Sequence, residues 1–336
     1  MTGPSEGHWQ EAVSRLAGAR EVALACHVAP DGDALGSVLA LGAALRSRGV
    51  EVVASWGGEP FEIPAAYSYL PAVDLLVPPS EFPRAPALFV TLDTGSADRL
   101  GSLEDRVETA GYTVVIDHHP SNTRYGDLHL VDGTSAATVV LVAALLDRMG
   151  IPLTQEIAAP LYTGLVTDTG SFRYLATTPS VHELAARLLA TGIRHDLITR
   201  AIYDTAPFGW VGLLARVCGR AKLEVDAVAG LGLVWTVVQP EDFFDCGLGL
   251  ADVEGVIDVI RTTQEAEVAV VVKADPLAGD WKVSTRSKGS VDVGLICTAL
   301  GGGGHRFAAG FSSADDPMVT LDRLRAALAD APHLPA

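Results

Sequence analysis

The run TVVIDHHP at residues 113–120 strongly limits how this chain can fold. Its β-branched residues are typical of a buried strand, and the strand leads directly into Asp117, His118 and His119. Each imidazole carries a donor and an acceptor that burial must satisfy, so two adjacent histidines are costly in a core. The run predicts a strand that ends in metal-binding or phosphate-binding side chains, although an ordinary polar loop can carry the same letters.

Three further apolar segments, at residues 22–37, 87–101 and 161–174, each carry acidic side chains where an expected element ends. The first two segments contain strand patterns, and the third is an apolar helical stretch. Groups at the carboxyl ends of neighbouring strands in an open α/β sheet converge on one crevice, so we expect the segments to share a site. The residues at these ends are His27, Asp31, Asp33, Asp93 and Asp168.

The charges of this set indicate what the site binds. Four carboxylates, those of Asp31, Asp33, Asp93 and Asp168, resist joint ionisation at short range unless cations compensate them. Two divalent cations would neutralise the set. Oxygen and imidazole donors without thiolates suit Mn²⁺ or Mg²⁺ better than structural zinc, and imidazole is a less usual ligand of Mg²⁺. The sequence therefore predicts two divalent cations, with Mn²⁺ favoured over Mg²⁺.

Taken singly, these residues also have simpler interpretations. His27 can be a satisfied histidine at a strand end, and Asp33 can cap the helix that follows it. Their occurrence together with the other segments favours the metal site. Cys26 is interpreted as a small buried hydrophobic residue and is left out of the site.

Composition favours an enzyme with two domains and a small anionic substrate. At 336 residues and 49% hydrophobic content, the chain is long enough for two cores. Its net charge of −17 offers no broad basic surface for a long nucleic acid, although acidity also serves solubility alone. Positive charge near the motifs is concentrated in Arg286, Lys288 and Arg306.

Several features favour a cytoplasmic protein without a membrane partner. The four cysteines, at positions 26, 218, 246 and 297, form no CxxC pair, which argues for a reducing compartment. The first twenty residues lack the apolar core of a signal peptide. The longest apolar run, residues 137–146, is well short of the ~20 residues that span a bilayer.

Residues 1–190 alternate strand and helix patterns, which predicts an α/β domain whose mostly parallel sheet has helices on both faces. Its strands and helices are expected at 22–26, 34–48, 50–55, 87–93, 113–117, 135–149 and 155–168. Residues 191–220 are predicted to form a helical linker. Residues 221–336 predict a smaller mixed α/β domain, with strands at 231–239, 266–275 and 280–287 and a helix around 253–260.

A glycine run at residues 301–304 marks this second domain. Glycines can adopt positive φ and present backbone N–H groups closely to a phosphate, but such a run can also be only a flexible turn. Because His305 follows the run and Arg286 and Lys288 precede it, the context favours substrate capture.

The motifs HVAPDGD, TLDTGSADRLG, IDHHPSN and GLVTDTGSF occur in the order of the DHH phosphoesterases, and GGGGHRFAAGF resembles the signature of their DHH-associated C-terminal domain. With STRSKGSVDVG, the pattern is similar to the branch of nano-RNases and pAp phosphatases, which act on very short oligoribonucleotides and on 3'-phosphoadenosine 5'-phosphate (pAp). The resemblance covers about residues 20–315, with every metal-site residue present.

The resemblance implies a specific set of metal ligands. One cation would be held by His27, Asp31 and Asp93, and Asp93 would bridge to the second. The ligands implied for the second cation are Asp33, Asp93, His118 and Asp168. His119 would face the phosphate, and Asp117 would orient an imidazole.

The same resemblance implies a role for the C-terminal domain, residues 221–336. There Arg286 and His305 would bind the phosphate or nucleotide of the substrate, so that the domain selects short substrates. The substrate-binding residues assigned on this basis are Arg286, Lys288, Gly303, Gly304 and His305.

The expected activity is two-metal hydrolysis of short oligoribonucleotides or pAp. Alternatives are a phosphodiesterase of linear or cyclic dinucleotides, a manganese pyrophosphatase and a non-catalytic nucleotide sensor. The sequence does not rank these substrates, and it leaves open whether the chain forms a homodimer.

Overall fold

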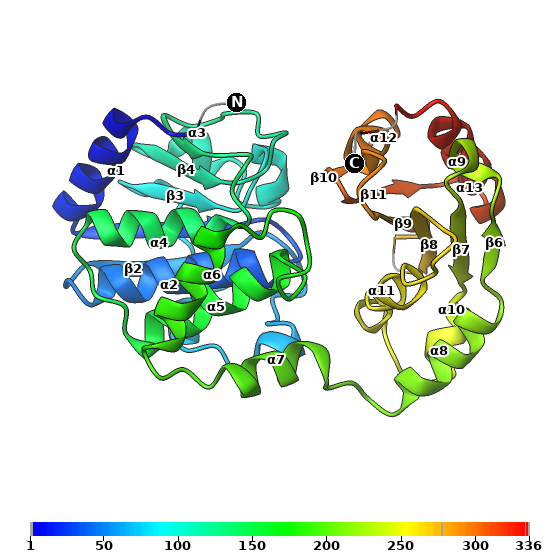
Figure 1. The fold of residues 1–336 in the computed structure, drawn as a ribbon. Helices are drawn as coiled ribbons and strands as arrows, with labels where there is room; N and C mark the ends of the chain where they lie inside the picture. The colour runs from blue at the N-terminus through cyan, green and yellow to red at the C-terminus, as the bar shows by residue number, and fades with distance from the viewer. Residues whose placement is uncertain (1–2, 277, 333, 335–336) are drawn as a thin grey trace. The chain divides into compact units, whose positions relative to one another are not determined.

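The computed structural model describes residues 3–276, 278–332 and 334. The chain forms two compact units, residues 1–205 and 206–336, each with its own sheet and hydrophobic core (Figure 1). The expected α/β class is confirmed.

The first sheet has the strand order β2-β1-β3-β4-β5, and every neighbouring pair is parallel. The chain runs from β1 outward to β2 and then returns to the other side of β1. Open α/β sheets bind ligands at such a reversal, beyond the carboxyl ends of the two central strands, here β1 and β3. The strands are β1 (Glu21–Cys26), β2 (Glu51–Trp56), β3 (Phe89–Leu92), β4 (Thr113–Asp117) and β5 (Leu128–Val131).

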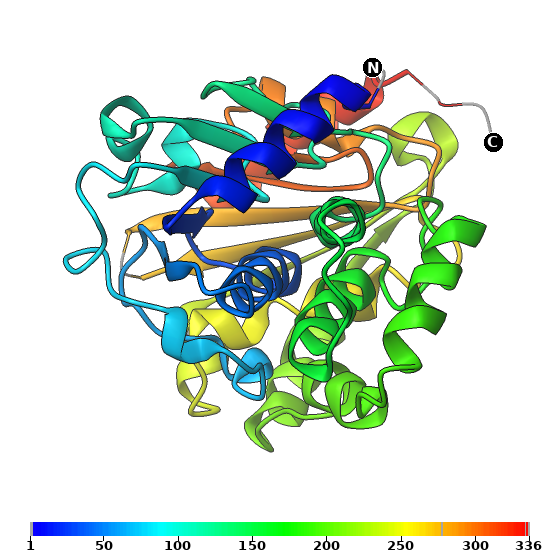
Figure 2. The same cartoon turned by 90° about the vertical axis from the view of Figure 1, so that its left-hand side faces the viewer.

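Alternating side chains of β1 enter cores on both faces of this sheet. Val22 and Leu24 share a large core with long helices, one of which is α1, in dark blue in Figure 2. Ala23 and Ala25 share a smaller cluster with residues near the short helix α3. The predicted helices on both faces are thus confirmed. The helices are α1 (Glu6–Gly18), α2 (Gly32–Arg46), α3 (Arg106–Thr109), α4 (Thr138–Arg148), α5 (Gln155–Asp168), α6 (Pro179–Leu189) and α7 (His195–Tyr203).

Some element boundaries differ from the sequence-based prediction. Helix α2 begins at Gly32 rather than at residue 34, because Asp31 Oδ1 accepts hydrogen bonds from the N–H groups of Asp33 and Ala34, both at 3.0 Å. Helix α4 begins at Thr138 rather than at residue 135, since Ala137 is extended. The sequence patterns do not predict α1, which is largely polar, or β5, which has four residues.

Helices α2 and α5 pack closely through glycines. A Cβ on Gly32 would meet the side chain of Thr167, and one on Gly36 would lie 2.5 Å from the carbonyl oxygen of Pro160, so the two helices run antiparallel. A Cβ on Gly164 would lie 2.8 Å from Asp33 Oδ1. The glycines therefore let the start of α2 and the end of α5 approach each other, and each of these ends carries a predicted metal ligand.

We expect Gly36→Ala to lower the free energy of unfolding by about 1–3 kcal/mol, the usual cost of overpacking. The added Cβ would meet the backbone of Pro160, which cannot rotate away. Gly18→Ala is the control, because a Cβ there meets nothing within 4 Å; its stability should be unchanged or slightly higher. Urea unfolding measures both variants, and equal stabilities would contradict a tight contact between α2 and α5.

The second sheet has the order β10-β11-β9-β8-β7-β6, in which only β7 and β8 are parallel neighbours. This confirms the predicted mixed α/β character. Its strands are β6 (Lys222–Glu224), β7 (Leu233–Val238), β8 (Val268–Asp275), β9 (Asp280–Ser287), β10 (Gly303–His305) and β11 (Ala308–Ser313). The helices around it are α8 (Gly209–Gly219), α9 (Ala227–Gly230), α10 (Pro240–Phe244), α11 (Val256–Ile260), α12 (Val293–Ala299) and α13 (Pro317–Ala329).

The segment 191–220, predicted as a helical linker, contains the boundary between the two units. Its helix α7 belongs to the first unit, where Ile198 is part of the large core. Its helix α8 belongs to the second unit, where Leu213 and Val217 are buried. The functional division into domains 1–190 and 221–336 stays a prediction. Among the described residues, no helix is both long and apolar enough to cross a membrane.

Candidate functional site

The predicted metal-binding residues of the first unit gather at the carboxyl ends of its strands. His27 directly follows β1, Asp93 directly follows β3, and His118 directly follows β4. Asp93 has a φ of 55°, a conformation that non-glycine residues rarely adopt outside functional or strained positions. The cluster thus lies at the topological switch point between β1 and β3.

Two groups of side chains each bring their ligand atoms within 4.8 Å of one another. In the first group, His27 Nε2 lies 3.5 Å from Asp93 Oδ2 and 3.9 Å from Asp31 Oδ1. In the second group, His118 Nε2 lies 3.1 Å from Asp168 Oδ2 and 3.7 Å from Asp33 Oδ2. Four segments far apart in the sequence therefore meet in one place. The groups are His27, Asp31 and Asp93, and Asp33, His118 and Asp168.

Asp93 connects the two groups. Its Oδ2 faces His27, and its Oδ1 lies 3.5 Å from His118 Nε2. The side chain is 3% exposed, so both oxygens are directed into the cluster rather than into solvent. A carboxylate whose two oxygens face different ligand groups has the geometry of a bridge between two cations.

The backbone fixes the tautomers of two histidines. His27 Nδ1 lies 2.8 Å from the carbonyl oxygen of Val28, and His118 Nδ1 lies 3.2 Å from that of Ser135. A carbonyl oxygen can only accept, so each Nδ1 donates its hydrogen. In the neutral ring, Nε2 then has a lone pair that can bind a metal. The hydrogen bond from Nδ1 to the carbonyl oxygen holds each ring in its orientation.

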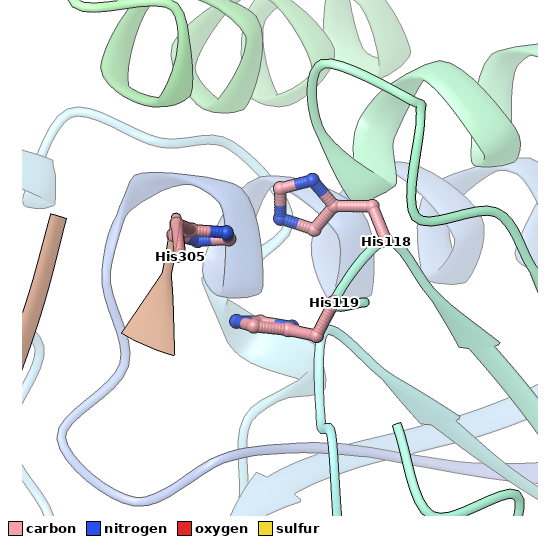
Figure 3. A group of neighbouring side chains, drawn as sticks. All are labelled: His118, His119 and His305. Atoms are coloured by element: carbon pink, nitrogen blue, oxygen red, sulfur yellow. The ribbon is translucent and has the colours of Figure 1, made fainter. Parts of the chain in front are cut away.

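The third residue of the histidine motif differs in its environment. His119 Nδ1 lies 2.7 Å from Asp117 Oδ1, and the amide of Asn122 donates to Asp117 Oδ2 at 2.6 Å. The buried Asp117 thus orients the ring of His119. The ring centroids of His118 and His119 lie 5.0 Å apart, and the two ring planes are inclined at 64° (Figure 3). The catalytic orienting role assigned to Asp117 stays a prediction. The phosphate contact of His119 stays a prediction.

Asp33 has a structural contact that the sequence does not indicate. Its carboxylate accepts hydrogen bonds from the N–H groups of Thr138 and Val139, at 2.6 Å and 2.9 Å, so it caps helix α4 rather than its own helix. The positive end of α4 thus faces this fully buried carboxyl group. Asp31, which the sequence analysis assigns only to metal binding, caps α2.

Thr138 contacts two candidate ligands at once. While its N–H donates to Asp33, its hydroxyl donates to Asp93 Oδ1 at 2.8 Å. The sequence alone does not indicate a role for Thr138, because a threonine that opens an apolar helix is typical of an ordinary cap. The run of small residues at 135–137, which leads from β5 into α4, is the signal that could have drawn attention to it.

We expect Thr138→Val to weaken Mn²⁺ binding about tenfold or more, the lower end of the effect of losing a hydrogen bond to a metal ligand. Valine keeps the shape and the N–H but lacks the hydroxyl that orients Asp93. Thr138→Ser keeps the hydroxyl and should retain most of the affinity. Calorimetric titration with Mn²⁺ compares the variants, and equal losses in both would assign the effect to packing.

Several pKa values reflect the crowding of charge. Burial disfavours the charged form of His27, but its hydrogen bond to Asp93 and the charge of Asp31 outweigh this and raise the pKa of His27 to about 9. The pKa of Asp93 is lowered: burial raises it, but the contacts with His27 and the neighbouring histidines prevail.

Two other carboxyl groups of the cluster, those of Asp33 and Asp168, have raised pKa values. Burial and the charges of Asp93 and Asp168 raise the pKa of Asp33 well above its usual value. Burial raises the pKa of Asp168 to about 6, although His118 opposes the shift. At neutral pH the cluster without cations therefore holds a proton on His27. Divalent cations would replace this positive charge, so the donor set fits metal ions.

The predicted substrate-binding residues lie in the second unit. His305 in β10 pairs with Ala308 in β11, and Ala308 pairs with Arg286 in β9. Directly paired residues point to the same face, so Arg286 and His305 share a face two strand spacings apart, or ~10 Å. Lys288 lies beyond β9 and donates to the carbonyl oxygen of Thr263.

The glycine run is not merely a flexible turn. Gly303 and Gly304 belong to β10 and pair with Gly310 and Ala309. Gly304 has a φ of 134°, and a Cβ there would lie 2.7 Å from a backbone oxygen of the neighbouring strand. The glycine at 304 is therefore required by close strand pairing. The phosphate capture expected of this run stays a prediction.

Known proteins are similar to this chain along most of its length. Residues 21–165 match the model of the DHH family, N-terminal domain, and residues 247–332 match that of the DHHA1 domain. A bifunctional oligoribonuclease and PAP phosphatase of Thermus thermophilus is 36% identical over 287 residues, which cover 85% of this chain and 82% of the relative. The protein of the same name from Bacillus subtilis is 27% identical over 291 residues, which cover 85% of this chain and 87% of that relative.

A solved structure has the same fold. An exopolyphosphatase-related protein from Bacteroides fragilis superposes with a TM-score of 0.85 over 96% of each chain, at 23% sequence identity. At this identity the likeness supports the architecture of the chain and not its substrate.

Proposed function

Because the chain belongs to the DHH family, we propose that it is a phosphoesterase that uses two divalent cations to hydrolyse short oligoribonucleotides, pAp or both. The observation that carries the proposal is the position of Asp93, whose two oxygens face separate groups of ligand atoms. Two bound cations would supply an activated water and compensate the charge of the phosphate.

The chain's own residues would serve this reaction in three ways. His27 and His118 offer Nε2 because carbonyl oxygens hold the hydrogen on Nδ1. The contact of His119 with Asp117 and the nearby charge of Asp93 outweigh burial and raise the pKa of His119. A protonated His119 can donate a hydrogen bond to a phosphate oxygen. The cations, Mn²⁺ before Mg²⁺, would be held by the six residues His27, Asp31, Asp33, Asp93, His118 and Asp168.

The substrate class follows from the relatives and from the second unit. The Thermus and Bacillus relatives are described as acting on oligoribonucleotides and PAP. Among the described residues, the Arg286 side chain donates a hydrogen bond from its Nη1 to the carbonyl oxygen of Thr285. Its remaining donors are suited to bind a phosphate bidentately.

A panel of four substrates tests the proposal. With Mn²⁺ present, the protein should hydrolyse pAp or a diribonucleotide faster than pyrophosphate or a cyclic dinucleotide. Fastest turnover of pyrophosphate would favour a pyrophosphatase, and fastest turnover of a cyclic dinucleotide would favour the cyclic phosphodiesterase. Binding without turnover of any of the four would favour a sensor.

Arg286→Ala is expected to raise the KM for pAp and dinucleotides. Loss of one charge-assisted phosphate contact costs about 1.5–3 kcal/mol, or roughly tenfold to a hundredfold in kcat/KM. Small activated phosphodiesters that do not reach Arg286 should be spared. Arg323→Ala, which removes an exposed arginine paired with Asp315, is the control for charge.

Steady-state kinetics on an RNA length series completes this test. Rates of the wild-type protein should fall beyond a few nucleotides, since the acidic surface offers a long strand little to bind. Equal losses on small esters and dinucleotides in Arg286→Ala, or a wild-type preference for long RNA, would contradict substrate selection by the second unit.

A further inference from the structure

The first unit contains a second concave region, at the amino ends of its strands. A cavity of about 1010 Å³ is lined by the loops that precede β1, β2, β3 and β4 and by the ends of α1 and α4. The candidate metal cluster lies at the carboxyl ends of the same strands. Strand β1 has six residues and therefore separates the two regions by ~20 Å. The cavity is thus distinct from the metal cluster.

Four arginines from three segments line this cavity: Arg15, Arg20, Arg48 and Arg148. Residues 1–205 contain 13 arginines, no lysine and 24 acidic residues. Nearly a third of the positive charge of a strongly acidic unit therefore surrounds one cavity. The acidic residues in the lining are Glu21 and Glu51, so the lining carries a net positive charge.

Two of the arginines are engaged by neighbouring groups. Arg15 pairs with Glu11 at 3.2 Å and lies over the ring of Tyr112. Arg148 contacts Glu6 at 3.6 Å and lies over the ring of Trp9. These contacts hold both guanidinium groups at the rim of the cavity.

Arg20 and Arg48 have N–H groups that are available to a ligand. Arg48 donates from Nη2 to the carbonyl oxygen of Gly150, and both Arg48 and Arg20 are exposed. Within the described part of the chain, neither forms an ion pair with Glu21 or Glu51. A guanidinium carries five N–H donors in a planar fork that matches phosphate. The pair therefore offers two bidentate phosphate contacts.

The remaining lining is apolar and includes Leu45, Leu88 and Ile151. The volume is at the upper end of the range for ligand pockets, about 300–1,000 Å³, and exceeds what one phosphate needs. An anion with several linked phosphates could contact the guanidinium groups of Arg20 and Arg48, and an attached nucleoside could pack against the apolar part of the lining.

We propose that this cavity binds a ligand with at least two linked phosphate groups, held by Arg20 and Arg48. Two sources share this chemistry, a nucleoside polyphosphate and inorganic polyphosphate. The inference does not depend on the proposed catalytic activity, because the cavity uses none of the residues of the metal cluster.

The test is calorimetric titration of the full-length, metal-free protein with ATP and, separately, with tripolyphosphate. Both should bind the wild type. The double variant Arg20→Ala/Arg48→Ala should bind at least tenfold more weakly, whereas Arg84→Ala/Arg200→Ala, which removes two exposed arginines outside the cavity, should bind as the wild type does.

The two ligands distinguish the source. Tighter binding of ATP would identify the nucleoside polyphosphate, and equal or tighter binding of tripolyphosphate would identify the inorganic chain. Unchanged affinity in Arg20→Ala/Arg48→Ala, an equal loss in the control pair, or no binding by the wild type at millimolar ligand would overturn the proposal. If the alanine pair does not fold, Arg20→Lys/Arg48→Lys replaces it; that pair keeps the charge but lacks the fork, and should bind several-fold more weakly.

Discussion

Asp93→Asn should lower kcat for pAp and dinucleotides by orders of magnitude while the protein remains folded. Asp93 faces His27 with one oxygen and His118 with the other, so its loss as a ligand weakens both proposed cation positions together. Asparagine has nearly the same shape, and it tolerates the positive φ of this position as aspartate does. The backbone at the end of β3 should therefore be retained.

The measurements for this variant are kcat at saturating Mn²⁺, Mn²⁺ affinity and the unfolding transition. Asp98→Asn is the matched control, because Asp98 is exposed and belongs to neither group of ligand atoms. Near-normal kcat in a folded, metal-replete Asp93→Asn protein would reject the bridging role.

Removal of divalent cations by a chelator should abolish hydrolysis, and Mn²⁺ should restore it better than Mg²⁺. The reason is the presence of imidazole among the ligands, which suits Mn²⁺ better. Activity measured after dialysis and after addition of each ion tests this expectation. Better recovery with Mg²⁺ would contradict the choice of metal and not the site.

Metal affinity should also increase with pH. In the metal-free protein the pKa of His27 is raised to about 9, so its ring is protonated at neutral pH and a cation must displace the proton. The pKa of Asp168 is raised to about 6, so this carboxyl adds a second competing proton only below pH 6. Each displaced proton makes the apparent affinity rise by about tenfold per pH unit below the pKa. Mn²⁺ titrations between pH 6 and 8.5 measure this slope, and a flat profile would contradict proton displacement.

The convergence of the acidic segments could be predicted because it follows from topology. Once residues 22–26, 87–93 and 113–117 are identified as parallel strands, the side chains that follow them must meet at one edge of the sheet. Asp168 is predicted less directly, since a helix end has no fixed place relative to a sheet. The close approach of Gly164 in α5 to Asp33 in α2 brings the end of α5, and with it Asp168, to the cluster. This approach depends on the packing of α2 against α5.

The supporting contacts could not be predicted, because they join residues far apart in sequence. Asp33 caps α4, which begins 105 residues later, and Thr138 reaches Asp93 across 45 residues. The residues next to Asp33, Asp93 and Thr138 in the sequence give no indication that these side chains meet. In the second unit, the shared face of Arg286 and His305 depends on strand register, and the sequence analysis does not predict β10 or β11 as strands.

The central claim is that this cluster holds two cations that hydrolysis requires. The most direct measurement is a titration of metal-free protein with Mn²⁺, in which the number of ions bound per chain and the rate of pAp or dinucleotide hydrolysis are followed together. We predict two ions per chain, with hydrolysis appearing as the second ion binds. Full turnover without metal, or saturation of the rate with a single ion, would contradict the account.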